Sequence, residues 1–573
     1  MIAEQTERSA VDRWVTAGIL LLAVVAVGYV AALGSNLPTN DEWDLFPSVL
    51  ASHFPAAWLI EHHNEHRYPL GKLLWVVGLQ ATGFDFRTGM FTTVAILTAA
   101  SFLFTSAVRR LRGSARVAEL VIPALLLNAG HWYNLLMGYQ IVFALVVLGL
   151  AGVTWAATRI PRSQSLRPAV VGGVSAWVIG QSGGFGLAAT PALVLWLFWV
   201  AIRRAVDPSP GRWRQTGVIL LFPIGLLAYS GWVATTTPRL GSLPGSAPLD
   251  VVTATVGFLE IGWGTCVIDL AGRMQLVGGV FAVAAYSLAG WSTLRALRHA
   301  ERASAAIGIG LILVVVGSMA VAIALARGFG LCERFVTVSA AGLCLCWVAI
   351  AGFGPTIPFS PRIGAVLGQL AAVLIVGMNV ATGLQYAQIH RAVAKSFQAD
   401  IRGGMPPIFL AGKYGGIMPF LIGDRLGERI ARLRDRKVGI FRDAGVDPSF
   451  EVVPAKGMST FQIQCSVEPF LPGGVPPQFP LPSPGRSVVG LRLMVEQHHA
   501  MGYQQLRIRW RSRGSDGSER SATATPTSIP GRSGAVFRID DDPIDLRLEP
   551  ACPILGLTVE SAEWLMLSNP QHP

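Results

Sequence analysis

Charged residues are scarce in this chain: they make up 14% of its 573 residues, whereas a soluble protein usually carries about 25%. This deficit excludes an ordinary soluble domain, and the 52% of hydrophobic residues predicts an integral membrane protein. Internal repeats and heptad runs are also lacking, so nothing indicates a repeat array or a coiled coil. The formal net charge of +12 comes from short arginine clusters between apolar runs, as in the cytoplasmic loops of membrane proteins. We therefore expect no nucleic-acid partner.

Eleven apolar runs are expected to cross the bilayer. The first, 14–33, has 20 residues, enough to span roughly 30 Å of hydrocarbon. The apolar core of a cleaved signal has roughly 7–15 residues, so we expect a retained first helix. The predicted spans are 14–33, 88–108, 117–130, 139–158, 169–181, 185–202, 215–235, 274–294, 305–326, 335–353 and 363–383.

The arginine clusters predict the orientation. With the N-terminus in the cytoplasm, every compact cluster falls on the inner side, as the positive-inside rule requires. This orientation requires that 68–84 lies at the membrane interface and that 251–270 does not cross the bilayer. If 251–270 does cross, all later segments have the opposite orientation. Eleven spans place the region after residue 383 outside the cytoplasm. The clusters lie at 109–116, 159–167, 203–214 and 295–302, with Arg362 after them.

Three regions are predicted along the chain. Residues 1–383 form a transmembrane domain, and 384–486 a connector that ends in a stretch rich in proline and glycine. Within the connector, "GGIMPFLIGDRLGERIARLRDRKVGIF" has the spacing of an amphipathic helix on the bilayer surface. Residues 487–573 contain short alternating segments with turn residues between them, which predicts a small β-sandwich outside the cytoplasm. Cys465 and Cys552 bracket this sandwich and would suit a disulfide in an oxidising compartment.

The first outer loop, 34–87, concentrates the charge of the chain. It begins with "NDEWD" at 40–44, so that Asp41 and Glu42 follow the first span near the level of the lipid head groups. A carboxylate at this height could accept a proton from an acceptor hydroxyl while a lipid-linked donor is attacked. The alternative is that these acidic residues are helix caps or solvated loop charges.

The same loop contains "EHHNEHR" at 61–67, where Glu61 and Glu65 are four residues apart, as are His62 and His66. On a helix each pair would share a face, and His62 and His66 could then hold a divalent metal, with Asp41 or Glu42 completing the set. A zinc peptidase would read H-E-x-x-H, so a peptidase is disfavoured. Binding of phosphate by His66 and Arg67, or a structural hydrogen-bond network, are the other interpretations.

Two further outer turns contribute candidates. Arg334 precedes the predicted span at 335 and could bind phosphate through its two-pronged guanidinium, or pair locally with Glu333. Gln140 belongs to "NAGHWYNLLMGYQ" at 128–140, whose side chains could contact a sugar or simply form an interfacial aromatic belt. Trp510 and Trp564 could stack on glycan, although a lone tryptophan in a strand is more often core.

The stretch 39–112 resembles the start of the polytopic glycosyltransferases of the GT-C superfamily, such as protein mannosyltransferases and the bacterial aminoarabinose transferases that act on lipid A. In these enzymes an Asp-Glu pair follows the first helix, and a His-Pro-Pro-Leu segment opens an interfacial helix. Here "HRYPL" at 66–70 resembles that segment but departs from it. The chain also resembles a group of bacterial membrane proteins that share an "HNEHR" loop, over residues 12–385. The matching elements are "NAGHWYNLLMGYQ" (128–140), "QSGGFGLAATPA" (181–192) and "CERFVTVS" (332–339).

The resemblance implies an α-helical polytopic membrane enzyme of the bacterial cytoplasmic membrane. It would move a sugar from a polyprenyl-phosphate donor to a glycan, lipid or protein acceptor at the outer face, among membrane lipids, with Asp41 as inverting base. Only Asp41 and Glu42 carry over by position, with Glu42 assisting the base or binding metal. Our own inference adds substrate contacts by Glu61, His62, Glu65, His66, Arg67, Gln140 and Arg334. No cofactor is implied beyond an optional divalent metal at His62 and His66. A transporter or flippase of lipid-linked glycan, and a non-catalytic protein of envelope assembly, are the alternatives.

Overall fold

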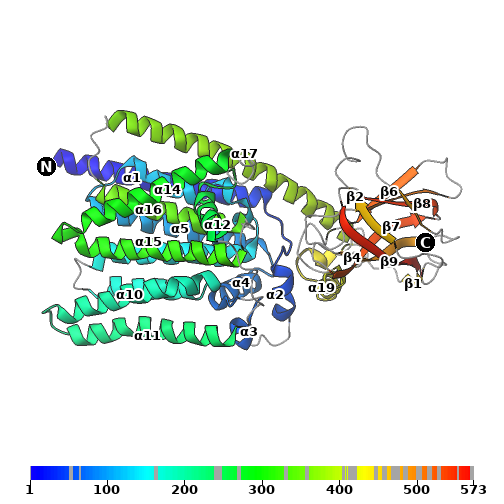
Figure 1. Cartoon of the computed structure of the whole chain (residues 1–573), viewed down its shortest axis with the longest axis horizontal. Helices are drawn as coiled ribbons and strands as arrows, with labels where there is room; N and C mark the ends of the chain where they lie inside the picture. Colours follow the sequence, from blue (N-terminus) through cyan, green and yellow to red (C-terminus); the bar gives the residue numbers. More distant parts are fainter. Residues whose placement is uncertain are drawn as a thin grey trace. The chain divides into compact units, whose positions relative to one another are not determined.

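The structure is a computed structural model, and its chain divides into two compact units (Figure 1). The first unit comprises Met1–Ser35, His53–Thr82 and Phe86–Ile389, and the second comprises Asn36–Ser52, Gly83–Asp85 and His390–Pro573. The described residues are 2–50, 56–63, 66–160, 165–237, 248–266, 273–327, 333–354, 361–402, 407, 410, 414, 423–443, 450–454, 461–465, 478–481, 488–497, 506–512, 519–524, 531–541, 543–550 and 554–567.

The first unit is built from long apolar helices. Among the described residues, seven helices are long and apolar enough to cross a membrane, which confirms a polytopic membrane protein. Their candidate spans are Ala10–Leu33, Arg87–Arg112, Gly138–Arg159, Gly184–Val206, Arg212–Thr236, Ala300–Ala326 and Glu333–Phe353. The main helices are α1 (Ile2–Leu33), α5 (Arg87–Arg112), α8 (Ile141–Arg159), α9 (Arg167–Gly180), α10 (Gly184–Val206), α11 (Arg212–Thr236), α12 (Pro248–Glu260), α14 (Arg273–Ala296), α15 (Ala300–Arg327), α16 (Val336–Phe353) and α17 (Pro361–Arg402). Helix α17 belongs to this unit up to Ile389 and to the second unit from His390.

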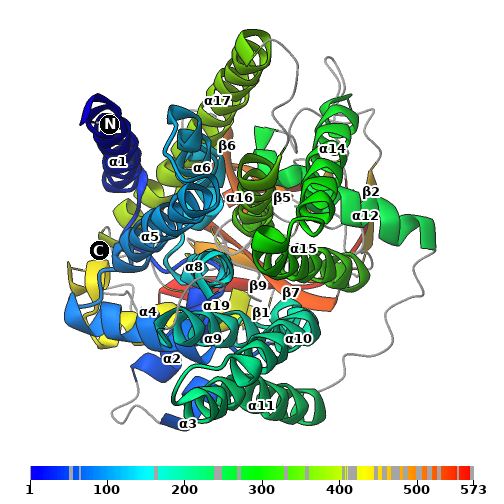
Figure 2. The ribbon, with the colours of Figure 1, turned by 90° about the vertical axis from the view of Figure 1, so that its left-hand side faces the viewer.

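Helix α8 lies at the centre of this unit, in contact with α5, α9, α15 and α16 (Figure 2). It is apolar on every face, as expected of a helix surrounded by other helices. Small residues permit the close packing, as in other membrane bundles: a Cβ at Gly152 would lie 2.1 Å from the Ser175 hydroxyl of α9. By contrast, α1 and α11 expose large apolar side chains such as Leu21 and Leu221. These two helices therefore have the surfaces expected to face lipid.

The predicted span at 117–130 is wrong, because this segment forms short helices in place of one long one. They are η1 (Val117–Leu120), α6 (Val121–Leu126) and η2 (Ala129–His131), followed by α7 (Trp132–Leu135) and η3 (Gly138–Gln140). The Asn128 side chain breaks the helical path, since it accepts a hydrogen bond from the Gly130 amide and caps the next turn.

Other short helices bear on the predicted topology. Helix α9 has 14 residues, about 21 Å at 1.5 Å per residue, which is less than the roughly 30 Å of hydrocarbon. The count of eleven spans is therefore not confirmed, and the orientation that depends on it stays a prediction. Helices α4 (Pro69–Ala81) and α12 have 13 residues each, consistent with the expectation that 68–84 and 251–270 do not cross.

The second unit contains α2 (Glu42–Val49), α19 (Gly423–Asp435), η7 (Gly439–Asp443) and two antiparallel sheets. In the described part of the chain one sheet has the order β1-β9-β4-β7 with β2 also paired to β9, and the other has the order β3-β8-β5-β6. The predicted C-terminal sandwich is thus confirmed, and it also takes in strands that precede residue 487. The strands are β1 (Phe450–Pro454), β2 (Phe461–Cys465), β3 (Phe479–Pro480), β4 (Val488–Gln497), β5 (Leu506–Ser512), β6 (Glu519–Ala524), β7 (Gly531–Asp541), β8 (Pro543–Pro550) and β9 (Ile554–Leu567).

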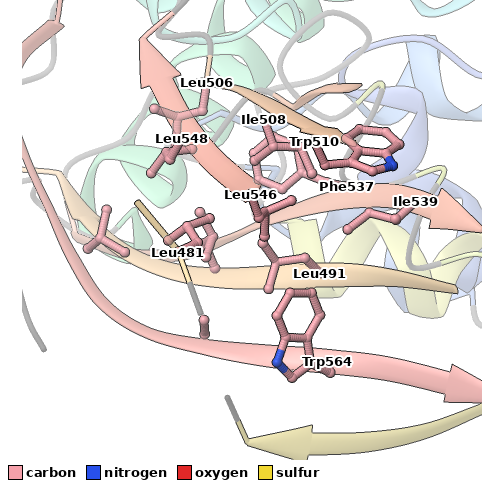
Figure 3. Packing of buried hydrophobic residues seen from close by; sticks show 13 residues of the cluster. Leu481, Leu491, Leu506, Ile508, Trp510, Phe537, Ile539, Leu546, Leu548 and Trp564 are labelled. Carbon is pink, nitrogen blue, oxygen red and sulfur yellow. The ribbon is translucent and has the colours of Figure 1, made fainter. Parts of the chain in front are cut away.

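The two sheets share one hydrophobic core, in which Leu506, Ile508 and Trp510 of β5 approach Phe537 and Trp564 of the other sheet (Figure 3). The alternation of β5 explains this, because every second side chain of a strand points to the same face. Both tryptophans are buried, at 4% and 3% exposure, and therefore act as core residues. Cys552 lies outside the described residues, so the predicted disulfide does too.

Helix α19 falls within the segment predicted to lie on the bilayer surface. The helix is present, and its repeated arginines alternate with apolar positions as the sequence indicates. However, Ile430 and Leu433 are fully buried inside the second unit. The apolar side of α19 is therefore covered by protein.

Candidate functional site

The charged loop lies between two short helices of the first unit, α3 (Ala56–Ile60) and α4. Pro69 starts α4, as expected of a residue whose fixed φ suits the first helical position. Between the helices, the backbone N–H of His63 donates to the carbonyl of His66 at 2.7 Å, and the reverse bond measures 3.0 Å. This isolated antiparallel bridge stands where a helix was expected, on which residues four apart would share a face. The expected helical pairing of His62 with His66 is therefore wrong.

No group of three histidine, cysteine, aspartate or glutamate side chains that could hold a metal is present among the residues the structure describes. His62 contacts the Thr237 hydroxyl through Nε2 at 3.4 Å. Burial, and then the charges of Arg67 and Lys72, lower the pKa of His62, so its imidazole is neutral at pH 7. Glu65 lies outside the described residues, whereas Glu61 is exposed and its backbone carbonyl accepts a hydrogen bond from Lys72.

Arg67 is buried at 8% exposure, and the acceptors that hold it are neutral. Its Nη1 donates to the Ile60 carbonyl at 2.5 Å, and its Nη2 donates to the Thr236 hydroxyl at 3.0 Å. The guanidinium also lies 4.3 Å from the centroid of the Trp232 ring. Within the described structure its Nε is buried without a hydrogen-bond partner. The carbonyl end of α11 favours a cation at this place through the helix dipole.

Lys72 is a second cation in the same loop, and sequence reasoning did not select it as a site residue. Its Nζ is fully buried and donates to the carbonyl oxygens of Trp58, at 2.9 Å, and Glu61, at 2.8 Å. Burial lowers the pKa of Lys72 to about 8; Glu61 raises it and Arg67 lowers it further. The available signal was a lone lysine in an otherwise apolar segment, since a buried lysine needs dedicated acceptors.

The loop packs against the turn between α9 and α10. His66 accepts the Gly184 N–H through Nδ1 at 3.3 Å, so its ring hydrogen is on Nε2 and the imidazole is neutral. Gly183 has φ +86°, and a Cβ there would lie 2.9 Å from the Tyr68 ring, so only glycine fits. A cavity of about 10 Å³ lies among His66, Arg67, Gly184 and Tyr229, enough for about one water molecule.

A buried polar network joins the 128–140 turns to the start of α16. Asn134 donates through Nδ2 to the Arg334 carbonyl at 2.9 Å and to the Thr337 hydroxyl at 2.6 Å. His131 Nε2 lies 2.6 Å from the Leu125 carbonyl, which can only accept, so this nitrogen bears the hydrogen. The neutral ring then accepts the Thr337 hydroxyl hydrogen at Nδ1, 2.8 Å away. The network fixes the backbone at Arg334.

Arg334 and Gln140 are both in the first unit. The Arg334 guanidinium is half-buried and lies 5.8 Å from the centroid of the Phe335 ring. Gln140 is buried at 3% exposure, and its Oε1 has no hydrogen-bond partner among the described residues. Gln140 therefore retains one acceptor for a hydroxyl donor or a water.

Asp41 and Glu42 lie in the second unit, at the N-terminus of α2. Asp41 occupies the N-cap position and is half-buried, but its side chain makes no capping hydrogen bond. Glu42 is fully buried, and its Oε2 accepts the Thr39 N–H at 2.8 Å and the Thr39 hydroxyl at 3.0 Å. Asn40, between them, has φ +44°, a conformation that asparagine tolerates better than most residues. The two acidic residues thus have different environments, and Glu42 closes the turn that presents Asp41.

Among solved structures, the chain is similar to ArnT from Cupriavidus metallidurans. The structure of ArnT bound to undecaprenyl phosphate is 16% identical, with a TM-score of 0.37, and the match covers 74% of this chain and 80% of ArnT. The apo structure is 14% identical, with the same TM-score of 0.37, and the match covers 76% of this chain and 74% of ArnT. No family model and no curated protein sequence matches the chain.

Proposed function

We propose that this protein is a membrane glycosyltransferase that takes its sugar from a polyprenyl-phosphate donor. The acceptor is a glycan, lipid or protein at the outer face of the bacterial cytoplasmic membrane, and Asp41 is the general base. The observation that carries the proposal is the pair of buried cations, Arg67 and Lys72, in a loop between apolar helices. Within the described structure, the hydrogen bonds of both cations go to uncharged oxygens, and a phosphate would supply the opposing charge.

In the proposed reaction an acceptor hydroxyl attacks the anomeric carbon and forms the new glycosidic bond, while the bond from that carbon to the phosphate oxygen breaks. The hydroxyl proton passes to the Asp41 carboxylate, and the electron pair leaves with the polyprenyl phosphate. Attack opposite the leaving group inverts the anomeric centre. General-base assistance of this kind contributes about 10²–10⁴-fold to the rate.

The remaining candidates take supporting roles in this proposal. Arg67 and Lys72 compensate the charge of the leaving phosphate, and Arg334 is a further candidate for the same task. His66 stays a candidate for the donor phosphate, and Gln140 offers an acceptor to a sugar hydroxyl. Glu42 holds the turn before α2 through Thr39, so its assistance to Asp41 is indirect. No step is assigned to a metal, because the described residues provide no three-ligand group.

The test is transfer by the purified protein in proteoliposomes that contain a panel of polyprenyl phosphates bearing different radiolabelled sugars, together with an envelope fraction that supplies glycan, lipid and protein acceptors. Appearance of labelled product with inverted configuration, together with free polyprenyl phosphate, would support the proposal. A transporter or flippase would move a fluorescent lipid-linked glycan across the bilayer without breaking this bond. Movement without cleavage across the whole panel would overturn the proposal.

A further inference from the structure

The helix that bears Asp41 is anchored by residues more than 350 positions later in the chain. Trp43, two residues after Asp41, is fully buried. Its ring packs edge-on against Phe397, at a centroid distance of 6.3 Å, and against Phe441, at 6.5 Å. Phe397 also packs edge-on against Tyr414, at 4.9 Å. Edge-to-face aromatic pairs are directional, so this cluster fixes both the depth and the tilt of the Trp43 side chain.

An ion pair anchors the next residue of the same helix. Asp44 Oδ1 lies 2.5 Å from Nη1 of Arg429 in α19, across 385 positions of sequence. Helix α19 is itself held in place, because Ile430 and Leu433 are fully buried. The Arg429 side chain is 15% exposed and the Asp44 side chain is 36% exposed, so the pair lies at the surface of the second unit, and its role is to restrain α2 together with the Trp43 cluster.

These contacts leave the first turn of α2 little freedom. Trp43 and Asp44 are adjacent on the helix and therefore point in different directions, so their anchors restrain both the rotation and the translation of the helix. Upstream, Glu42 ties the turn back to Thr39, and Asn40 takes a left-handed conformation. Asp41 lies between these restraints.

We infer that Phe397 of α17, Arg429 of α19 and Phe441 of η7 hold the helix that bears Asp41, and that Arg429 and Phe441 are positioning residues for the proton transfer. The inference rests on the proposed role of Asp41 as general base. These residues follow the last predicted span, and the inference gives them a part in catalysis. A substitution among them would alter the position of Asp41 through α2. Arg429 and Phe441 would then affect kcat, whereas the affinity for the donor, which the first unit is proposed to bind, would not depend on them.

The experiment is a charge exchange in the full-length protein, with transfer measured as kcat and as KM for the donor. The single variants Asp44→Arg and Arg429→Asp place like charges together and are expected to lower kcat at least about ten-fold, with KM within about two-fold of wild type. The double variant restores an ion pair of opposite polarity and is expected to recover kcat to within about three-fold. Glu519→Arg, beside Arg509 in the sandwich, is the matched control and is expected to leave kcat unchanged.

The melting temperature of each variant is measured beside its kcat. If a charge reversal prevents folding, Asp44→Asn and Arg429→Gln are used in its place, and each is expected to lower kcat three- to ten-fold. Asp41→Asn is measured in parallel. If Asp41→Asn is inactive while both single variants keep wild-type kcat, the positioning inference is overturned and the proposed function stands. If Asp41→Asn keeps full activity, the role of Asp41 fails, and with it the reason to position this residue. Failure of the double variant to recover activity, although it folds, also contradicts the inference.

Discussion

The ammonium group of Lys72 donates to the carbonyl oxygen of Trp58 at 2.9 Å and lies 4.7 Å from the centroid of the same residue's ring. One side chain of α4 thereby holds the end of α3, and a second hydrogen bond, to the Glu61 carbonyl, extends this to the start of the charged loop. Among the described residues, the Lys72 ammonium group is in direct contact with two carbonyl oxygens and an aromatic ring, and with no carboxylate. Lys72 therefore joins the two helices that flank the candidate donor-binding loop.

The buried position of Lys72 predicts a pH dependence of stability. Burial lowers its pKa from 10.5 in the unfolded chain to about 8 in the folded protein, so the unfolded chain binds more protons between these values. Stability from this group is therefore lowest below pH 8 and rises as the pH increases to 10.5. Between pH 8 and pH 10.5 the free energy of unfolding of the wild type is expected to rise by about 2–3 kcal/mol relative to that of Lys72→Met.

Melting temperatures of the two proteins in detergent, from pH 7.5 to pH 10.5, measure this gain. Lys72→Arg is the control, because arginine stays charged over the whole range and its difference from Lys72→Met should be flat. A wild-type difference that is equally flat would show that the Lys72 pKa is not lowered.

Arg67 is expected to control the affinity for the donor. Hydrogen bonds to charged groups contribute about 1.5–3 kcal/mol, so Arg67→Gln should raise KM for the polyprenyl-phosphate sugar about 10- to 100-fold, with a smaller effect on kcat. Thr236→Val, which removes one neutral acceptor and leaves the charge, should change KM by less than about five-fold. Steady-state kinetics on the purified proteins measure both. An unchanged KM in Arg67→Gln would assign this arginine a purely structural role.

The network around Thr337 is expected to contribute to stability. Thr337→Val would leave Asn134 Nδ2 with one acceptor and His131 Nδ1 with no donor in a fully buried place. Leaving a buried polar group unpaired costs about 1–3 kcal/mol, which should appear as a lower melting temperature. Thr337→Ser keeps the hydroxyl and should melt close to the wild type. Equal melting temperatures for the valine and serine variants would contradict the assigned hydrogen bonds.

Gly183 is expected to tolerate no side chain. Its φ of +86° and the Tyr68 ring 2.9 Å from an ideal Cβ predict that Gly183→Ala lowers the free energy of unfolding by about 1–3 kcal/mol. Gly217 is the matched control, because it lies inside α11 with open space around its Cβ position. Gly217→Ala should raise stability by about 0.5–1 kcal/mol. Thermal melting distinguishes the two, and equal effects would contradict the strain at Gly183.

The long helices were predictable because a run of about 20 apolar residues has few structures other than a membrane span. The segment 117–130 misled for a local reason: it is as apolar as a span, but Asn128 caps a new turn inside it. Alternation predicted the sandwich strands, although β1 and β2 pair with β9 across about a hundred residues, and pattern alone cannot give such pairing.

The candidate site was harder to predict than the fold. Sequence spacing suggested a helix through His62 and His66, and the mutual hydrogen bonds of His63 and His66 exclude it. Lys72 was overlooked because its acceptors are backbone carbonyls, which a sequence does not display. The sequence does not show that Asp41 and Glu42 have different environments. The hydrogen bonds between Thr39 and Glu42 show this difference.

The central claim is that the Asp41 carboxylate takes the proton of the incoming hydroxyl, and single-turnover transfer with Asp41→Asn tests it most directly. Removal of a general base is expected to slow the chemical step about 10²–10⁴-fold while donor binding stays at the wild-type level. The Glu42→Gln amide oxygen can still accept from Thr39, so the transfer rate of this variant is expected to remain within about ten-fold of the wild type. The control Glu519→Gln, in the sandwich, is expected to have the wild-type rate. Full transfer by Asp41→Asn, or loss of transfer in Glu42→Gln alone, would contradict the account.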